Sequence, residues 1–60
     1  MRQYLLFEAT RDLRELRFVK QVESRNIRDL SRALKKSSLF DNGTIVLAVS
    51  KNCIKRVIVQ

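Results

Sequence analysis

An amphipathic segment from Asn26 to Ser38, NIRDLSRALKKSS, constrains the fold of this chain more than any other feature. At about 100° per residue, Ile27, Leu30 and Leu34 fall on one side of a helix, opposite a set of basic side chains. Asn26 is placed to cap the first turn, where the carboxylate of Asp29 also suits the positive end of the helix dipole. The segment therefore predicts a helix that packs one face and presents the other as a basic surface.

Residues 3–23, QYLLFEATRDLRELRFVKQVE, admit two interpretations. We favour a helix, because Leu6, Leu13 and Leu16 keep helical spacing and no Gly or Pro intervenes. The alternative makes Gln3 to Glu8 a short strand, with Thr10 capping a helix that begins at Arg11. In either case we expect a helix to precede the amphipathic one.

A hairpin is predicted for the last third of the chain. After the turn signal Asp41-Asn42-Gly43, two short runs rich in Val and Ile, TIVLAVS and CIKRVIVQ, flank Lys51-Asn52. A two-residue loop at Lys51-Asn52 pairs Val49 with Ile54, Leu47 with Arg56 and Ile45 with Ile58. Both faces of this ribbon are largely apolar, so we expect it to lie on the helices and to extend its sheet across a dimer edge.

Together these elements predict an α+β fold in which two helices are followed by a C-terminal β-hairpin, with an extra N-terminal strand under the alternative above. We expect a single small basic domain over residues 1–60. A chain this short buries only about 60% of its surface. A homodimer, formed through the hairpin or the apolar side of the first helix, is therefore expected to add burial.

The predicted order of elements is similar in outline to phage repressors of the Cro type and to winged-helix domains, in which a basic helix enters the major groove of DNA. The segment RDLSRALKKS resembles a helix of a helix-turn-helix. The glycine-bearing turn and the third helix of those proteins have no counterpart in this sequence. The resemblance implies DNA binding only by analogy of architecture.

The charge balance indicates a polyanion as the first partner to consider. Thirteen Lys and Arg against six Asp and Glu give a net charge of +7. The predicted helix carries five of these cations, and only Asp29 interrupts them. We expect binding to nucleic acid, DNA before RNA, through five phosphate contacts on the helix and three auxiliary contacts on the hairpin: Arg25, Arg28, Arg32, Lys35 and Lys36, with Lys51, Lys55 and Arg56.

These features favour a small DNA-binding transcriptional regulator of phage or plasmid type that acts as a homodimer. Two alternatives stay open. The first is a protein-interaction module, an inhibitor or adaptor that docks its basic face on an acidic protein partner. The second is a basic component of a ribonucleoprotein that binds RNA. Tyr4, Phe7 and Phe18 stand near Arg11 and Arg14, a combination that can stack on bases, but we expect these rings in the core or at a subunit contact.

Residue types that carry catalysis or bind metals are scarce. The chain has no His, and its one cysteine, Cys53, excludes an intramolecular disulfide. Asp12 and Glu15 have enough arginine neighbours for ordinary ion pairs. We therefore expect no enzyme activity, no metal and no cofactor, and we interpret Cys53 as a small apolar filler with a reactive thiol as the alternative. No apolar run or leader indicates a membrane partner, so we expect a cytoplasmic protein, or one in the host cytoplasm if it is viral.

Overall fold

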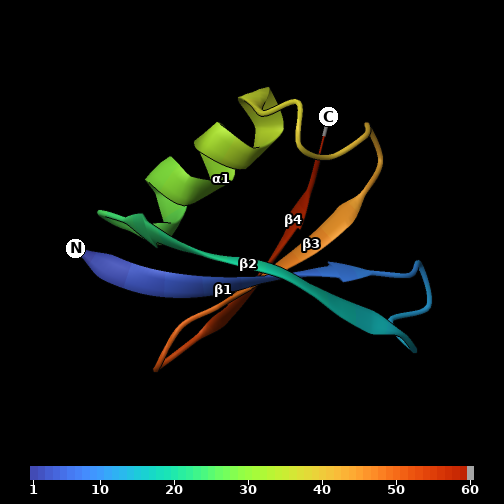
Figure 1. The fold of residues 1–60 in the computed structure, drawn as a ribbon, viewed down its shortest axis with the longest axis horizontal. Coiled ribbons are helices and arrows are strands. Elements are labelled where there is room, and N and C mark those ends of the chain that lie inside the picture. Colours follow the sequence, from blue (N-terminus) through green and yellow to red (C-terminus); the bar gives the residue numbers. More distant parts are fainter. Residues whose placement is uncertain (60) are drawn as a thin grey trace.

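One helix lies against one face of a four-stranded antiparallel sheet in the computed structural model, which describes residues 1–59 (Figure 1). The elements in chain order are β1 (Arg2–Ala9), β2 (Leu16–Ser24), α1 (Ile27–Lys36), β3 (Ile45–Val49) and β4 (Ile54–Ile58). The strand order is β2-β1-β3-β4, so the first strand lies inside the sheet and pairs with strands from both halves of the chain. Helix α1 contacts both outer strands, β2 and β4.

The predicted two-helix arrangement is wrong, because residues 3–23 form a β-hairpin. The alternative strand over 3–8 agrees with β1, but the helix that was to begin at Arg11 is a turn followed by β2. Apolar side chains stand at both odd and even positions of β1, such as Leu5 and Leu6, as suits an inner strand with a surface on each side. Because a β-hairpin stands where the first helix was predicted, the likeness in element order to Cro-type repressors and winged-helix domains is lost.

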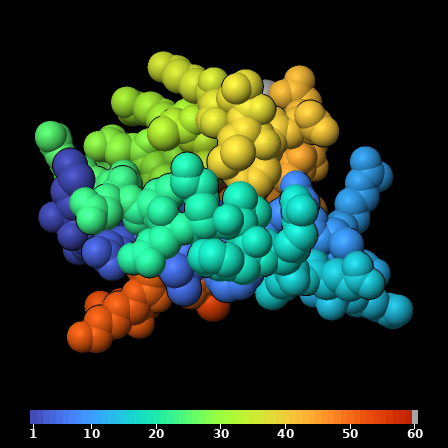
Figure 2. Space-filling view, viewed as in Figure 1, coloured from blue at the N-terminus to red at the C-terminus, as the bar shows by residue number. Residues whose placement is uncertain are grey.

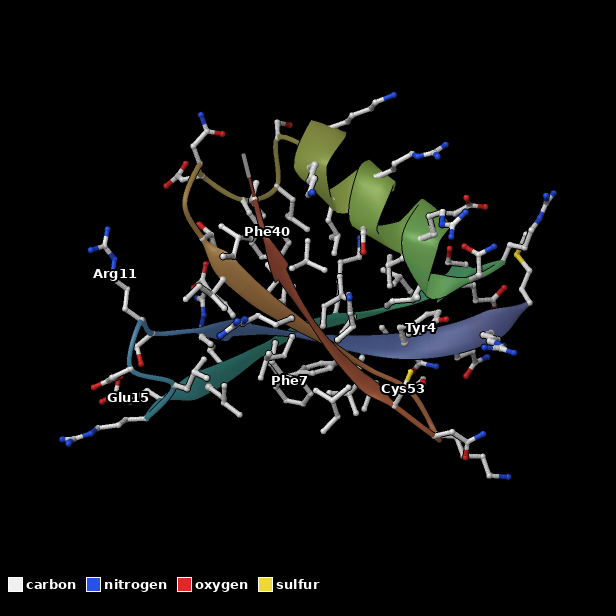
Figure 3. The ribbon with its side chains drawn as sticks, turned by 180° about the vertical axis from the view of Figure 1, so that it is seen from behind. Tyr4, Phe7, Arg11, Glu15, Phe40 and Cys53 are labelled. Atoms are coloured by element: carbon white, nitrogen blue, oxygen red, sulfur yellow. The ribbon has the colours of Figure 1, made fainter. Side chains whose placement is uncertain are left out.

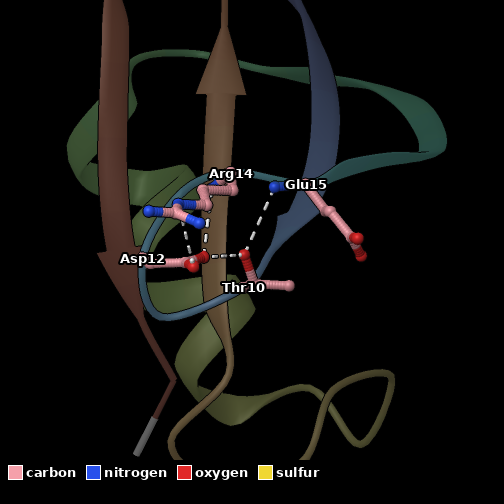
Figure 4. Close-up of polar contacts among 4 residues, drawn as sticks. All are labelled: Thr10, Asp12, Arg14 and Glu15. Carbon is pink, nitrogen blue, oxygen red and sulfur yellow. Dashed lines mark hydrogen bonds and ion pairs between the residues drawn. The ribbon is translucent and has the colours of Figure 1, made fainter.

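A turn without Gly or Pro joins β1 to β2. The hydroxyl of Thr10 donates to a carboxylate oxygen of Asp12 at 2.6 Å, and the backbone N–H of Arg14 donates to the same oxygen at 3.1 Å (Figure 4). Leu13 adopts a φ of 59°, a left-handed conformation that a leucine rarely takes. The turn is therefore held by local side-chain hydrogen bonds in place of the usual turn residues.

The helix and the second hairpin were predicted correctly. The side chain of Asn26 caps α1 by accepting a hydrogen bond of 2.8 Å from the backbone N–H of Asp29. Between β3 and β4, Val49 pairs with Ile54 and Ile45 with Ile58, as expected from a loop at Lys51-Asn52. Gly43 has a φ of 88°, which accounts for the only glycine in the sequence.

Alternation along the strands divides the sheet into two faces. The covered face packs against Leu30 and Leu34 of α1, and Phe40 of the following loop closes this core. A bulge opposite Leu6 adds Val19 to its edge. The buried strand residues of the covered face are Tyr4, Leu6, Val46, Ala48 and Val57. The second set, which we call the open face, has no helix over it and consists of Leu5, Phe7, Ala9, Leu16, Phe18, Ile45, Leu47, Val49, Ile54 and Ile58.

The open face is visible as a layer of its own. Figure 3 shows Phe7 on the side of the sheet away from α1, whereas Phe40 lies on the helix side. The rings of Phe7 and Phe18 meet edge to face, with centroids 5.6 Å apart. Figure 2 shows the tips of the two hairpins projecting at opposite ends of the molecule. The sheet is thus apolar on both surfaces, but the chain covers only one of them.

Candidate nucleic-acid interface

A groove of about 730 Å³ runs between α1 and the outer strand β4. Three of its cations come from the helix, where Arg28, Arg32 and Lys35 follow one another at steps of four and three residues and so share one side. Two more come from β4, which no other strand covers on its outer edge. The residues that line the groove are Ile27, Arg28, Ser31, Arg32, Lys35, Lys55, Arg56, Val57 and Ile58.

The packing of the helix against the sheet determines which way its three groove cations point. Leu30 and Leu34 are buried against the sheet, so the side of α1 that carries Arg28 and Arg32 is turned away from the core. The cap at Asn26 satisfies a free amide of the first turn and so defines where the helix begins. The three cations are therefore displayed on an anchored helix and not on a mobile loop.

The register of the second hairpin brings the β4 cations to the same groove. Lys55 pairs with Ala48, a fully buried residue of the covered face, so Lys55 lies on the helix side of the sheet. Arg56 pairs with Leu47 of the open face and lines the groove from the free edge of β4. Residues some twenty positions apart in the sequence thus surround one hollow.

Among the described residues, no carboxylate lines this groove. Among residues 1–59 the ion pairs are Arg14 with Asp12 at 3.5 Å and Arg17 with Glu8 at 2.7 Å, and both lie outside it. Within that range the five cations of the groove therefore have no acidic partner, and their fields add in the space between helix and strand. Such an arrangement repels cations and attracts an extended anion.

The structure brings together five of the eight predicted contacts and leaves three apart. Arg25 precedes the cap of α1, Lys36 ends the helix, and Lys51 lies in the loop between β3 and β4; none of them lines the groove. The sequence interpretation treated Lys55 and Arg56 as auxiliary, but they lie with the helix cations. It also missed Ser31, whose hydroxyl is the one neutral polar side chain of the lining.

The aromatic residues and the pair Asp12 and Glu15 are separate from the groove. Tyr4 is buried under the helix, and Phe18 is on the open face, so neither ring accompanies the cations. Asp12 and Glu15 belong to the turn between β1 and β2, where the backbone N–H of Glu15 donates to the Thr10 hydroxyl at 3.3 Å (Figure 4). The Thr10 hydroxyl, and then the Arg14 amide, lower the pKa of the Asp12 carboxyl. This cluster is accounted for as a turn.

The remaining candidates offer little chemistry. Residues 1–59 contain no group of three His, Cys, Asp or Glu side chains that would hold a metal ion. The Cys53 thiol is exposed, and its sulfur lies 3.1 Å from the Ser50 hydroxyl at the end of the second hairpin. The one described helix is too short to cross a bilayer. Comparison of the chain with protein-family models, curated proteins and solved structures found no match.

Proposed function

We propose that the groove between α1 and β4 binds the phosphate backbone of a nucleic acid, with duplex DNA as the first candidate. The observation that carries the proposal is the convergence of five cations from two distant elements on a groove whose described lining contains no carboxylate. Phosphate contacts supply most of the affinity of small basic domains for nucleic acid, and they position the protein without reading the sequence. Binding is therefore sequence-tolerant or modestly specific.

Each cation has a place in this scheme. Arg28, Arg32 and Arg56 have planar guanidinium groups that can hold a phosphate through two parallel hydrogen bonds. Lys35 and Lys55 act as point charges. Ser31 can add a neutral hydrogen bond to a phosphate oxygen. Arg25, Lys36 and Lys51 then serve as outer contacts that a longer duplex reaches. This division makes the groove cations the sensitive positions for mutation.

The biological role follows from the same proposal. A homodimeric DNA-binding regulator of phage or plasmid type, acting in the cytoplasm of a bacterial or host cell, fits a small, strongly basic chain. The protein-interaction module is the second candidate. It is favoured by the apolar part of the groove lining, which consists of Ile27, Val57 and Ile58. An acidic segment with apolar residues would suit such a lining. A ribonucleoprotein component, which binds RNA, is the third.

Salt titration tests the proposal and separates these candidates. The affinity for a fluorescent duplex of random sequence is measured by anisotropy between about 50 and about 200 mM salt. If all five groove cations meet phosphates, the affinity falls about 500-fold over this range, because log K changes by about 0.9 per phosphate for each tenfold change in salt. A wild-type protein that binds neither duplex nor single strand at low salt contradicts the proposal and leaves the acidic protein partner.

A matched pair of double variants locates the contact. Arg28→Glu with Arg32→Glu removes two groove cations, so the salt slope falls from about 4.5 to about 2.7 or lower. Arg2→Glu with Arg11→Glu alters the net charge equally at two exposed positions outside the groove. The control pair is expected to weaken binding less than threefold. Equal losses in the two pairs would show that net charge, and not the groove, binds DNA. Stronger binding to single-stranded RNA than to duplex DNA would favour the ribonucleoprotein.

A further inference from the structure

The open face is too large and too apolar to be an ordinary solvent surface. Its most exposed members are Leu5, Leu16, Phe18, Ile54 and Ile58, and Phe18 and Ile54 leave 54% and 69% of their surface uncovered. At roughly 200 Å² for a fully exposed large apolar residue, these five alone offer about 500 Å². The largest apolar patch of a typical monomer is about 300–600 Å² and is often an interaction site. The half-buried members between them enlarge the patch further.

The charges of the open face are balanced, unlike those of the whole chain. By register it carries one acidic residue, Glu23 opposite Gln3 on the outer strand β2, and one basic residue, Arg56 on the outer strand β4. The two charges sum to zero, whereas the chain carries +7. Cations of α1 lie on the other side of the sheet. A second copy can therefore approach this face without bringing the two cationic helices together.

We infer that two copies of this chain associate by packing their open faces together, so that the pair forms a two-sheet sandwich with a helix on each outer surface. Two sheets pack face to face at about 10 Å, with side chains of the two inner faces interdigitating, and the apolar residues here alternate as that arrangement requires. A two-fold axis through the face lets one surface serve as its own complement.

The size of the face agrees with what a stable pair needs. A standard interface buries about 800 Å² on each partner. The five exposed residues supply about 500 Å² of this, and half-buried residues such as Phe7 and Leu47 add to it. A 60-residue chain also gains from such a partner, because the core of its described residues consists of nine buried side chains, two of which belong to the helix itself. The pairing differs from an edge-to-edge dimer, which would leave the open face in water.

The groove lies mainly on the helix side of the sheet, so its α1 cations and Lys55 stay outside a dimer of this kind, and only Arg56 and Ile58 belong to both surfaces. Sedimentation equilibrium of the wild-type protein between about 1 and about 200 µM is expected to give twice the chain mass of 7.1 kDa at the higher concentrations. No nucleic acid is present in this experiment. A protein that fails to bind DNA therefore does not contradict the dimer, and a protein that sediments as a monomer does not contradict DNA binding by the groove.

Two substitutions of unequal severity and one matched control locate the interface. Phe18→Asp places a charge in the apolar contact and is expected to weaken dimerisation at least about 100-fold. Phe18→Thr introduces a β-branched residue that suits a strand and is expected to weaken dimerisation about tenfold, so this variant reports even if the Asp variant fails to fold. Leu39→Asp alters a leucine of similar exposure, 51%, in the loop after α1 and leaves the dimer intact.

Three results would overturn the inference. A folded wild-type protein that sediments as a monomer over the whole range excludes the dimer. A dimer that Leu39→Asp weakens as much as Phe18→Asp does, or that neither Phe18 variant weakens, lies elsewhere on the surface. A wild-type monomer that floats with vesicles of neutral phosphatidylcholine shows that lipid covers the open face instead. Circular dichroism of each variant confirms that the compared proteins are folded.

Discussion

The two faces of the sheet are built from the same strands and differ in what lies over them. On β1, Leu6 leaves 1% of its surface exposed and its neighbour Leu5 leaves 38%. On β3, Val46 is completely buried, and Leu47 is only half-buried. Composition does not explain this contrast, because both sets are aliphatic and aromatic. The difference is the helix: the chain supplies one cover for a sheet that has two apolar surfaces.

This contrast shows that burial pattern and hydrophobic pattern are separate properties of a strand. An antiparallel sheet with one wet face ordinarily alternates apolar and polar residues. Here the outward positions of β1 and β3 are apolar as well, so the strands have the composition of a sheet covered on both sides. We therefore interpret the open face as a surface that is covered in the assembled protein and the covered face as the core of one chain.

The largest effect is expected when the two adjacent leucines of β1, one on each face of the sheet, are truncated in turn. Leu6→Ala removes a buried side chain from under α1 and is expected to cost about 2–5 kcal/mol of unfolding free energy at every protein concentration. Leu5→Ala is expected to cost less, and its cost should grow as the protein concentration rises, because Leu5 gains contacts in the dimer that we propose. Urea unfolding at two protein concentrations measures both. Equal, concentration-independent losses would show that the two faces do not differ in this way.

A buried hydroxyl gives a smaller effect of opposite sign on the covered face. The hydroxyl of Tyr4 lies in the core and has no hydrogen-bond partner among the described residues. Removing it with Tyr4→Phe takes away an unsatisfied polar group and is expected to raise the unfolding free energy by about 1 kcal/mol. Phe7→Tyr, which adds a hydroxyl on the open face, is the matched control and should change the stability of the isolated chain little. Destabilisation by Tyr4→Phe would mean that the hydroxyl is paired in solution.

The smallest effect is expected in the turn between β1 and β2, which belongs to neither face. The hydrogen bond from Thr10 lowers the pKa of the Asp12 carboxyl, so the charged carboxylate stabilises the folded state above the ordinary pKa of 3.8 and loses this role as the pH falls through the lowered value. Asp12→Asn should therefore lower the melting temperature slightly at pH 7. The gap to wild type should close at strongly acidic pH. A constant difference across pH 2 to 7 would assign the effect to shape and not to charge.

Local chemistry made part of this fold predictable from sequence. Asn26 and Asp29 mark the start of α1, and the spacing of Leu30 and Leu34 identifies its buried side. The Lys51-Asn52 loop sets the register of the second hairpin. Each of these inferences depends on residues within a few positions of one another, where turn and cap geometry is decided.

The first hairpin was not predictable in the same way. Its turn has no Gly or Pro and includes Leu13 in a left-handed conformation, so the usual mark of a chain reversal is missing. The apolar residues of β1 fall on both faces, and Leu6 and Ala9 of this strand also keep helical spacing with Leu13 of the turn. Pairing with β3, forty residues later, decides in favour of a strand, and no local window contains that information.

The candidate site was predictable as a set of residues but not as a place. The cations of α1 and those of β4 were each recognised from charge and spacing. Their meeting in one groove requires that Lys55 face the helix and that β4 be an outer strand. The first condition depends on which of two apolar hairpin faces packs on α1, and the second on the pairing of β1 with β3. Both conditions are decided by tertiary contacts and not by local sequence.

The inner position of β1 has a consequence for how the protein is made. Among the described strands β1 leaves the ribosome first, yet one of its two partners, β3, emerges only with residues 45–49. Until then the nascent chain exposes an unpaired strand edge and apolar surface, the features that attract chaperones and promote misassembly. Because the sheet cannot be completed before residues 45–49 emerge, we expect the described strands to fold together in one step after that point.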